Sequence, residues 1–182
     1  MIPARTGITA ERNPFRTACL HALAPQLDEP LSAVLARFTA QGRRGVLVGV
    51  HGSGKTTVLE ALAPHLGEVI WLRLRHDRAH NRRALAAMPR RVNGVLLIDG
   101  LEQLGPLAWW QMRRRASAIL ATSHHRGRLP LLRLHQTSAE LLESLVSSLG
   151  QPPPLDAQQL VARHRGNLRD CLRELYDRAA SA

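Results

Sequence analysis

The sequence predicts an α/β fold, with one parallel sheet covered by helices on both of its faces. Five short apolar runs are each long enough for one strand, at residues 44–50, 68–74, 94–100, 117–123 and 130–136. Segments with helical spacing alternate with these runs along the chain. The runs are nearly continuous in apolar residues, which is typical of strands in a parallel sheet that is buried on both faces.

The segments between the strands have the spacing of amphipathic helices. In residues 30–42, Val34, Leu35 and Phe38 share one face, and Gly42 suits the end of the helix. After the last strand, a helix with its cap at Thr137 or Ser138 is expected, and two further helices follow the stiff segment QPPPLD. The remaining expected helices are 54–67, a short one at 80–88, and 107–116.

Length and composition suggest one domain with a small appendage. The chain has 182 residues, and we expect a lead-in with a helix at 1–41, a core at 42–137 and a helical lid at 138–182. No run is long and apolar enough to span a membrane, so we expect a soluble, cytoplasmic protein without a membrane partner. Cys19 and Cys171 have no metal-binding spacing and are expected to be free thiols.

The positive charge of the chain is concentrated in one segment. The net charge is +11, and residues 69–135 contain 13 arginines against Asp77, Asp99 and Glu102. A basic face of this kind favours an anionic partner such as nucleic acid. The alternative is a coding bias toward arginine, in which case these are ordinary solvated side chains.

The stretch GVLVGVHGSGKTTVLEAL, residues 45–62, contains the most specific motif. Gly49, Gly54, Lys55 and Thr56 fit G-x-x-x-x-G-K-[ST], a phosphate-binding loop between a strand and a helix. Glycines let the backbone N–H groups converge on phosphate oxygens, and the helix directs its positive end at the same anion. The residues expected to bind nucleotide are Gly49, Val50, His51, Gly52, Ser53, Gly54, Lys55, Thr56 and Thr57.

Lys55 is the only lysine in the chain. Arginine can replace lysine wherever only a surface charge is needed. The phosphate loop requires a compact ammonium on a flexible stem, and the wide planar guanidinium of arginine does not fit the same space. Retention of this one lysine therefore strengthens the prediction of a nucleotide site.

A carboxylate that completes a magnesium site follows the third apolar run. In VLLIDG, Asp99 ends the run 43 residues after Thr56, and together with the Thr56 hydroxyl it is expected to hold Mg²⁺. Guanine-specific switches need an [NT]-K-x-D segment, which a chain with one lysine already in its loop cannot contain. The LSGGQ signature of transporter ATPases is also absent, which removes that class of ATPase.

Three weaker motifs complete a resemblance to a known family. The run LATS ends with Thr122 and Ser123, RGNLRDCLREL contains G-x-x-R with Arg169, and ERNPF stands near the start. Together with the loop and Asp99, these resemble the AAA+ division of P-loop ATPases, in particular the bacterial secretion- and transposition-accessory members. The resemblance implies a three-layer P-loop NTPase fold with sheet order 5-1-4-3-2 and a C-terminal helical lid. It also implies that Thr122 is a first sensor, which orients water, and Arg169 a second sensor near the γ-phosphate.

The chain departs from the family pattern in two places. The family has a glutamate directly after the strand aspartate, whereas this chain has Gly100 there, and Glu102 is the candidate base. The connection HHRGRLP is too short for the helix that usually carries an arginine finger, although Arg126 and Arg128 could take that role.

The leading functional hypothesis is a weak magnesium-dependent ATPase that acts as a switch or assembly regulator. Its catalytic residues would be Lys55, Glu102, Thr122 and Arg169, with ATP and Mg²⁺ as cofactors. It could form a nucleotide-dependent oligomer or bind a protein partner that the sequence does not identify. The alternatives are a small-molecule or nucleotide kinase whose arginines clamp phosphates, a nucleic-acid loader using segment 69–135, and a scaffold that does not hydrolyse ATP.

Overall fold

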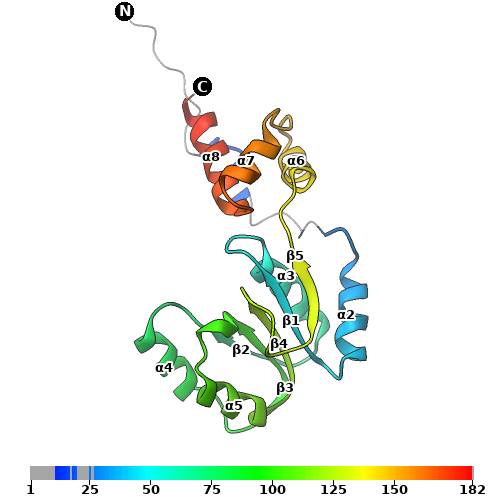
Figure 1. Cartoon of the computed structure of the whole chain (residues 1–182), viewed down its shortest axis with the longest axis vertical. Helices are drawn as coiled ribbons and strands as arrows, with labels where there is room; N and C mark the ends of the chain where they lie inside the picture. The colour runs from blue at the N-terminus through cyan, green and yellow to red at the C-terminus, as the bar shows by residue number, and fades with distance from the viewer. Residues whose placement is uncertain (1–10, 17, 20–24, 26, 182) are drawn as a thin grey trace, which may run out of the picture. The chain divides into compact units, whose positions relative to one another are not determined.

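The computed structural model describes residues 11–16, 18–19, 25 and 27–181. By its internal contacts the chain forms two compact units, which are described separately (Figure 1). The sheet unit consists of Leu27–Gly49 and Gly54–His135. The helical unit consists of Met1–Gln26, Val50–Ser53 and Gln136–Ala182.

The sheet unit is built on five strands in the order β2-β3-β4-β1-β5. Every neighbouring pair is parallel, and the order is the predicted 5-1-4-3-2 written from the other edge. Three central strands are almost wholly buried, as their apolar runs predicted. The strands are β1 (Arg44–Gly49), β2 (Val69–Arg73), β3 (Val92–Asp99), β4 (Ala116–Ser123) and β5 (Leu131–His135).

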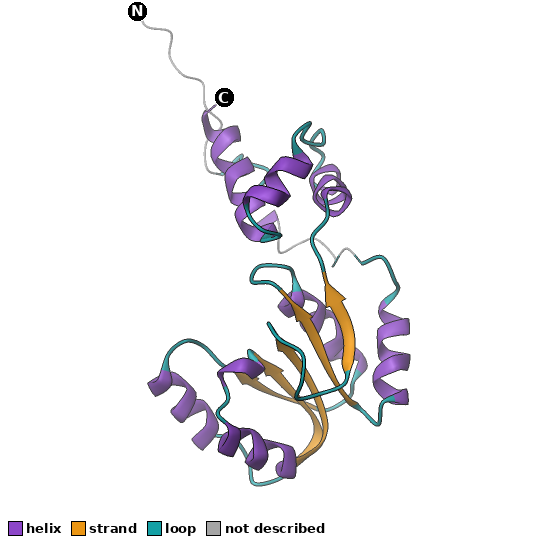
Figure 2. Ribbon diagram, in the orientation of Figure 1, coloured by secondary structure: helices purple, strands orange, loops and turns teal. Residues whose placement is uncertain are grey.

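Helices cover both faces of the sheet and give three layers (Figure 2). On one face, α4 (Arg78–Ala86) and α5 (Pro106–Arg115) pack on a core that includes Leu96, Ile98 and Met112. On the other face, α2 (Leu31–Ala40) and α3 (Lys55–Leu62) pack on a core that includes Leu97 and Leu59. Alternate residues of β3 thus enter opposite cores, because successive side chains of a strand point to opposite faces. The predicted three-layer fold is confirmed.

Several element boundaries differ from those predicted, for local reasons. Helix α3 ends at Leu62 and continues as the 3₁₀ turn η1 (Ala63–His65), because Pro64 has no N–H with which to extend the α-helical hydrogen bonds. Helix α4 begins before residue 80 because the Asp77 side chain accepts hydrogen bonds from the N–H groups of Ala79 and His80. Those bonds also lower the pKa of Asp77.

The helical unit contains α6 (Ala139–Ser148), α7 (Ala157–Arg163) and α8 (Leu168–Ser181). Ser138 caps α6 by accepting a hydrogen bond from the N–H of Leu141. Asn13 donates to the carbonyl of Tyr176 and accepts from the N–H of Phe15, and Phe15 joins the core of the unit. Within the helical unit, Asn13 therefore fixes the path of the backbone, and Phe15 contributes to the hydrophobic core.

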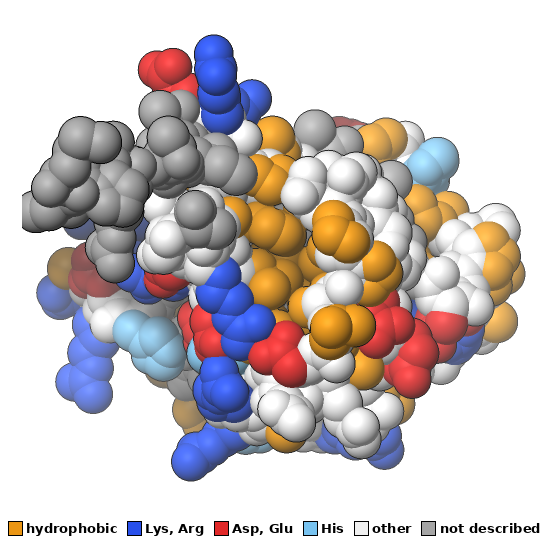
Figure 3. Space-filling view, turned by 90° about the horizontal axis from the view of Figure 1, so that it is seen from above, with side chains coloured by type: hydrophobic (Ala, Val, Ile, Leu, Met, Phe, Trp, Pro, Cys, Tyr) orange, Lys and Arg blue, Asp and Glu red, His pale blue; other side chains and the backbone are white. Residues whose placement is uncertain are grey.

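Hydrophobic side chains remain partly accessible around this core. In the view from above, hydrophobic side chains gather near the centre of the face, with acidic and basic side chains along its lower side (Figure 3). Leu141, Leu149 and Val161 pack against the core and are half-buried. Cys171 is fully buried and donates a weak hydrogen bond from Sγ to the carbonyl of Leu160; burial raises the pKa of its thiol. Cys19 and Cys171 are both free thiols.

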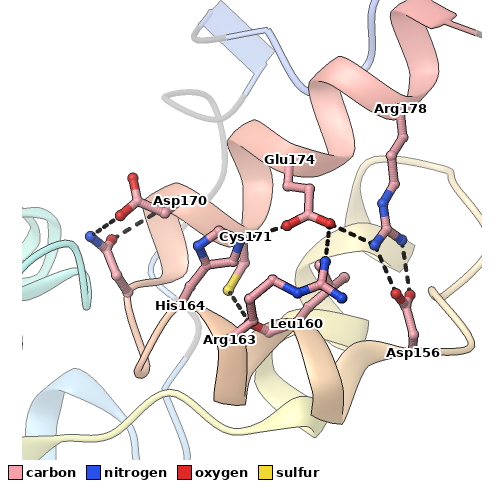
Figure 4. Close-up of polar contacts among 9 residues, drawn as sticks. Asp156, Leu160, Arg163, His164, Asp170, Cys171, Glu174 and Arg178 are labelled. Carbon is pink, nitrogen blue, oxygen red and sulfur yellow. Dashed lines mark hydrogen bonds and ion pairs between the residues drawn. The ribbon is translucent and has the colours of Figure 1, made fainter.

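A network of charged side chains joins α7 to α8 (Figure 4). Glu174 contacts Arg163, His164 and Arg178 at 2.6–2.7 Å, and Arg178 reaches both carboxylate oxygens of Asp156. These hydrogen bonds, first that of His164 and then that of Arg178, lower the pKa of Glu174. The network therefore links α7 to α8 through their charged side chains. Among the residues that the structure describes, no helix has both the length and the hydrophobicity required to cross a membrane.

Candidate nucleotide site

The predicted phosphate loop leaves the carboxyl end of β1 and leads into α3. Its backbone has positive φ at Gly52 (+73°) and Gly54 (+84°), a conformation that favours glycine. At Gly54 an added Cβ would meet nothing within 4 Å, so the backbone conformation alone accounts for this glycine. Gly54 also directly precedes Lys55, the first residue of α3.

Lys55 points back toward the start of the loop. Its ammonium donates a 2.8 Å hydrogen bond to the carbonyl of Gly49, and the residue is buried. Burial lowers the pKa of Lys55, whereas the charges of Glu102 and Asp99 act in the opposite direction. The Gly49 carbonyl at the end of β1 thus holds the single lysine, and the charges of Glu102 and Asp99 favour its charged form.

Thr56, Asp99 and Thr122 form a chain of hydrogen bonds across neighbouring elements. The Thr56 hydroxyl lies 3.1 and 3.2 Å from the two carboxylate oxygens of Asp99. The Thr122 hydroxyl donates to Asp99 Oδ1 at 2.6 Å and accepts from the N–H of Gly100 at 3.0 Å. A carboxylate and a hydroxyl in contact are hard oxygen donors that fit Mg²⁺. The two residues predicted to hold the metal therefore lie together, with the predicted first sensor beside them.

The backbone at Gly100 explains why glutamate does not follow Asp99 directly. Gly100 has φ of +89°, and an added Cβ would lie 3.1 Å from the carbonyl oxygen of Leu74. Both the conformation and the space disfavour a side chain there. Glutamate instead occurs in the 3₁₀ turn η2 (Leu101–Gln103), as Glu102.

Glu102 faces the same region as Lys55. Its side chain is 20% exposed, and Oε1 lies 3.7 Å from Nε2 of His124. The other oxygen, Oε2, is buried without a hydrogen-bond partner among the described residues. A carboxylate oxygen with free acceptor capacity suits a base for a water molecule. Sequence reasoning missed His124, although its place directly after Thr122 and Ser123 at the end of β4 was a usable signal.

Arg128 fixes the turn that carries Glu102. Its Nη1 donates to the carbonyl of Leu104 at 2.7 Å and to that of Leu101 at 3.3 Å. The guanidinium is thereby engaged inside the sheet unit, where it acts as a positioning group. Arg126 is exposed and lines a small pocket with Glu102 and His125. Arg126 and Arg128 are the two candidate arginine fingers. Among the described contacts, the guanidinium of Arg128 is hydrogen-bonded and that of Arg126 is not.

The predicted second sensor lies in the helical unit, in which the loop residues Val50–Ser53 are also grouped. A Cβ added to Gly52 would lie 1.9 Å from Oδ1 of Asn167 and 3.2 Å from Cβ of Arg169. Gly52 is therefore required by space as well as by its φ. Asn167 in turn donates to a carboxylate oxygen of Asp170. The sequence motifs did not indicate that Asn167 lies beside Gly52.

The other predicted loop residues vary in exposure. Val50 is 46% exposed, and Ser53 is buried, with its hydroxyl lacking a hydrogen-bond partner in the described part of the chain. A buried hydroxyl of this kind fits a loop whose polar groups serve to bind phosphate oxygens. His51, Thr56 and Thr57 are largely accessible, apart from the contact of Thr56 with Asp99.

Fold and site geometry together define a three-layer P-loop NTPase fold, and solved structures share it. A RuvB from Thermotoga maritima carrying a single substitution superposes with a TM-score of 0.52 at 19% identity, over 81% of this chain and 58% of that one. The T. maritima RuvB described as a Holliday junction branch migration motor gives a TM-score of 0.51 at 19% identity and the same coverage. This chain thus matches less than two thirds of the RuvB chain, and a likeness at this identity establishes the fold. No protein-family model and no curated protein sequence matches the chain.

Proposed function

We propose that this protein binds ATP with Mg²⁺ and hydrolyses it slowly, as a switch or assembly signal. The observation that carries the proposal is a group of polar contacts at the carboxyl ends of β1, β3 and β4. Thr56 and Thr122 both hydrogen-bond to Asp99, and the Lys55 ammonium bonds to the Gly49 carbonyl. These groups come from three separate segments of the chain. Each has the chemistry that its place in a phosphate and metal site requires.

In this proposal each residue has a separate task. Lys55 exchanges its bond with the Gly49 carbonyl for phosphate oxygens, and its partial burial strengthens that attraction. Thr56 and Asp99 would hold Mg²⁺, which supplies charge neutralisation on the phosphates when it is bound. Thr122 keeps the Asp99 carboxylate oriented through its 2.6 Å hydrogen bond. Glu102 accepts the proton of the attacking water through the oxygen that has no partner within the described residues.

Slow turnover follows from the place of the base. Glu102 is carried by a short 3₁₀ turn beyond Gly100, and the position of that turn depends on Arg128. A base held by a turn is less firmly positioned than one on a strand end, and misplacement of a catalytic group reduces its contribution. Arg169, close to Gly52 within the helical unit, is proposed as a nucleotide sensor. A nucleotide-dependent oligomer stays a prediction, which light scattering with and without ATP tests.

Fluorescence titration with mant-ATP tests the binding step. Wild type is expected to bind in the presence of Mg²⁺, whereas Lys55→Ala and Lys55→Arg should both lose binding, because neither supplies a narrow ammonium. Arg173→Ala is the matched control, since Arg173 is an exposed cation of the helical unit. Equal binding by all four proteins would contradict the proposal.

Phosphate release distinguishes the ATPase from the kinase alternative. Release without any added acceptor supports the ATPase. Turnover that requires an alcohol or nucleotide acceptor supports the kinase, with the pocket beside Arg126 as the place for the acceptor. Arg128 is a weak candidate for clamping a substrate, because its guanidinium already binds two carbonyl groups.

A further inference from the structure

The amino ends of three adjacent strands bring together seven arginines. Because β3, β4 and β1 are parallel neighbours, their first residues lie on one edge of the sheet, opposite the candidate nucleotide site. Val92 pairs directly with Ala116, whereas Arg44 pairs with Ile119, three residues beyond the start of β4. With neighbouring strands about 4.8 Å apart and a rise of about 3.3 Å per residue, the three starts fall within about 15 Å. In Figure 1 this edge lies at the lower end of the strands. We call it the arginine edge; it consists of Arg43, Arg44, Arg90, Arg91, Arg113, Arg114 and Arg115.

The cations of the arginine edge are not neutralised by carboxylates. None of the seven forms an ion pair within the described ranges, whereas Arg37, Arg133 and Arg178 elsewhere do. Arg44 instead donates to the carbonyls of Ala116 and Ser117, which ties the starts of β1 and β4 together. A dense set of like charges without carboxylate partners repels itself and attracts anions.

Arg43 adds a conformational observation. Its φ is +59°, in the left-handed region that favours glycine. The conformation is held by two backbone hydrogen bonds, from the N–H of Arg43 to the carbonyl of Phe38 and from the N–H of Ile119 to the carbonyl of Arg43. Arg43 therefore has a long cationic side chain at a position where glycine would adopt the backbone conformation with less strain. Strain retained in this way is a reason to look for a function of the side chain.

Helix α5 presents an aromatic ring next to these cations. Leu107, Trp110 and Arg114 are spaced for one helix face, and Leu107 and Trp110 are 69% and 54% exposed. The Arg114 guanidinium lies 4.7 Å from the centroid of the Trp110 ring. Met112, on the opposite face, is buried in the core. An exposed tryptophan beside several arginines is the combination that binds stacked bases and phosphates in single strands.

We propose that the arginine edge, together with Trp110, is a binding surface for single-stranded nucleic acid. The guanidinium groups contact backbone phosphates, and the Trp110 ring stacks on a base. An acidic protein would satisfy the charges but would leave the aromatic ring without its matching partner. The surface lies at the end of the strands away from Lys55 and Asp99, so it goes beyond the proposed ATPase and does not depend on it.

Fluorescence anisotropy with labelled oligothymidine over a series of salt concentrations tests the electrostatic part. Wild type should bind with a strong salt dependence. The double variant Arg90→Ala/Arg113→Ala should weaken binding and reduce the slope of log K against log salt by roughly 0.7 for each phosphate that the protein no longer neutralises. Arg173→Ala removes an exposed arginine of the helical unit and should leave the slope unchanged.

The aromatic part is tested by Trp110→Ala and Trp110→Phe. Removal of one stacking interaction should weaken oligothymidine binding about 5- to 150-fold, with little change in the salt slope. Phenylalanine should restore part of the affinity. Circular dichroism checks that both variants fold, which is expected because Trp110 is largely exposed.

Three outcomes would overturn the proposal: binding that none of these variants affects, tighter binding of a duplex than of the single strand, or equal competition by polyglutamate. Lys55→Ala separates this proposal from the proposed ATPase. That variant should lose mant-ATP binding and retain oligothymidine binding. Loss of both, in a folded protein, would contradict two independent sites.

Discussion

The two ends of the same three strands differ in how their polar groups are arranged. At the carboxyl ends of β1, β3 and β4, the polar side chains contact one another, as Thr122 and Thr56 do with Asp99. At the amino ends, the arginines stand without carboxylate partners among the described residues. The first arrangement suits a defined small ligand with a metal ion, and the second suits a long anion that contacts many cations.

One parallel sheet thus offers two separate edges whose polar groups suit different kinds of anion. Parallel strands place all carboxyl ends on one edge and all amino ends on the other. At the carboxyl edge, the Asp99 carboxylate is held by hydrogen bonds from the buried Thr122 and the accessible Thr56. At the amino edge, attraction comes from accumulated charge, which salt screens. Variants at each end are expected to differ accordingly in size of effect and in salt dependence.

The largest effect is expected from Glu102→Gln. Loss of a general base should lower ATP turnover by about 10²- to 10⁴-fold, while mant-ATP binding stays near that of wild type. Single-turnover assays measure the chemical step, and Gln103→Ala in the same turn is the control. Unchanged turnover would remove Glu102 from the mechanism.

Arg128→Ala should have the next largest effect, on both stability and turnover. It removes two charge-assisted hydrogen bonds to the carbonyls of Leu101 and Leu104, and the expected loss is about 2 kcal/mol of unfolding free energy. Urea denaturation and phosphate release measure the two effects. Arg126→Ala, an exposed neighbour, should change stability little. If Arg126→Ala instead abolishes turnover, Arg126 rather than Arg128 serves the site.

Gly100→Ala tests why the base is displaced from its usual place. The left-handed φ and the 3.1 Å approach to the Leu74 carbonyl should cost about 1–2 kcal/mol of unfolding free energy. Gly105→Ala is the matched control, because φ at Gly105 is −67° and an added Cβ would meet nothing within 4 Å. Equal stability of the two variants would show that the backbone does not impose glycine at position 100.

The smallest effect is expected at the amino edge, with the opposite sign. Arg91→Gln relieves repulsion among neighbouring cations and should raise the unfolding free energy by a few tenths of a kcal/mol at low salt. The gain should disappear as salt is added. Urea denaturation at two salt concentrations measures it. A loss of stability at low salt would mean that Arg91 has a stabilising partner.

Strands and helices could be predicted here because their hydrophobic patterns are local. The run VLLIDG reads as a buried strand by itself, and G-x-x-x-x-G-K-T places a loop before a helix. The strand order needed more, since apolar runs do not state which strands pair; it came from the resemblance to a known family. Element ends were predicted less well, because Asp77 and Pro64 act through individual hydrogen bonds.

Residues whose role depends on a distant partner were missed. His124 matters because it lies beside Glu102, and Asn167 because it lies beside Gly52. The sequence offered Arg128 as a finger, and its bonds to η2 depend on the path of the chain after β4. The charge of segment 69–135 is evident in the sequence, but Arg43 and Arg44 lie outside that segment and join it only through the pairing of β1 with β4.

By itself the sequence determined the phosphate-loop motif, the lone lysine, the strand carboxylate and the alternation of strands and helices, because each depends only on neighbouring residues. The tertiary structure decided which groups meet, Thr122 with Asp99 and Arg128 with η2, and it placed Arg43, Arg90 and Arg113 on one edge of the sheet. The physical reason is that side chains interact over a few ångströms of space. Separation along the chain does not limit them once the sheet has brought strand ends together.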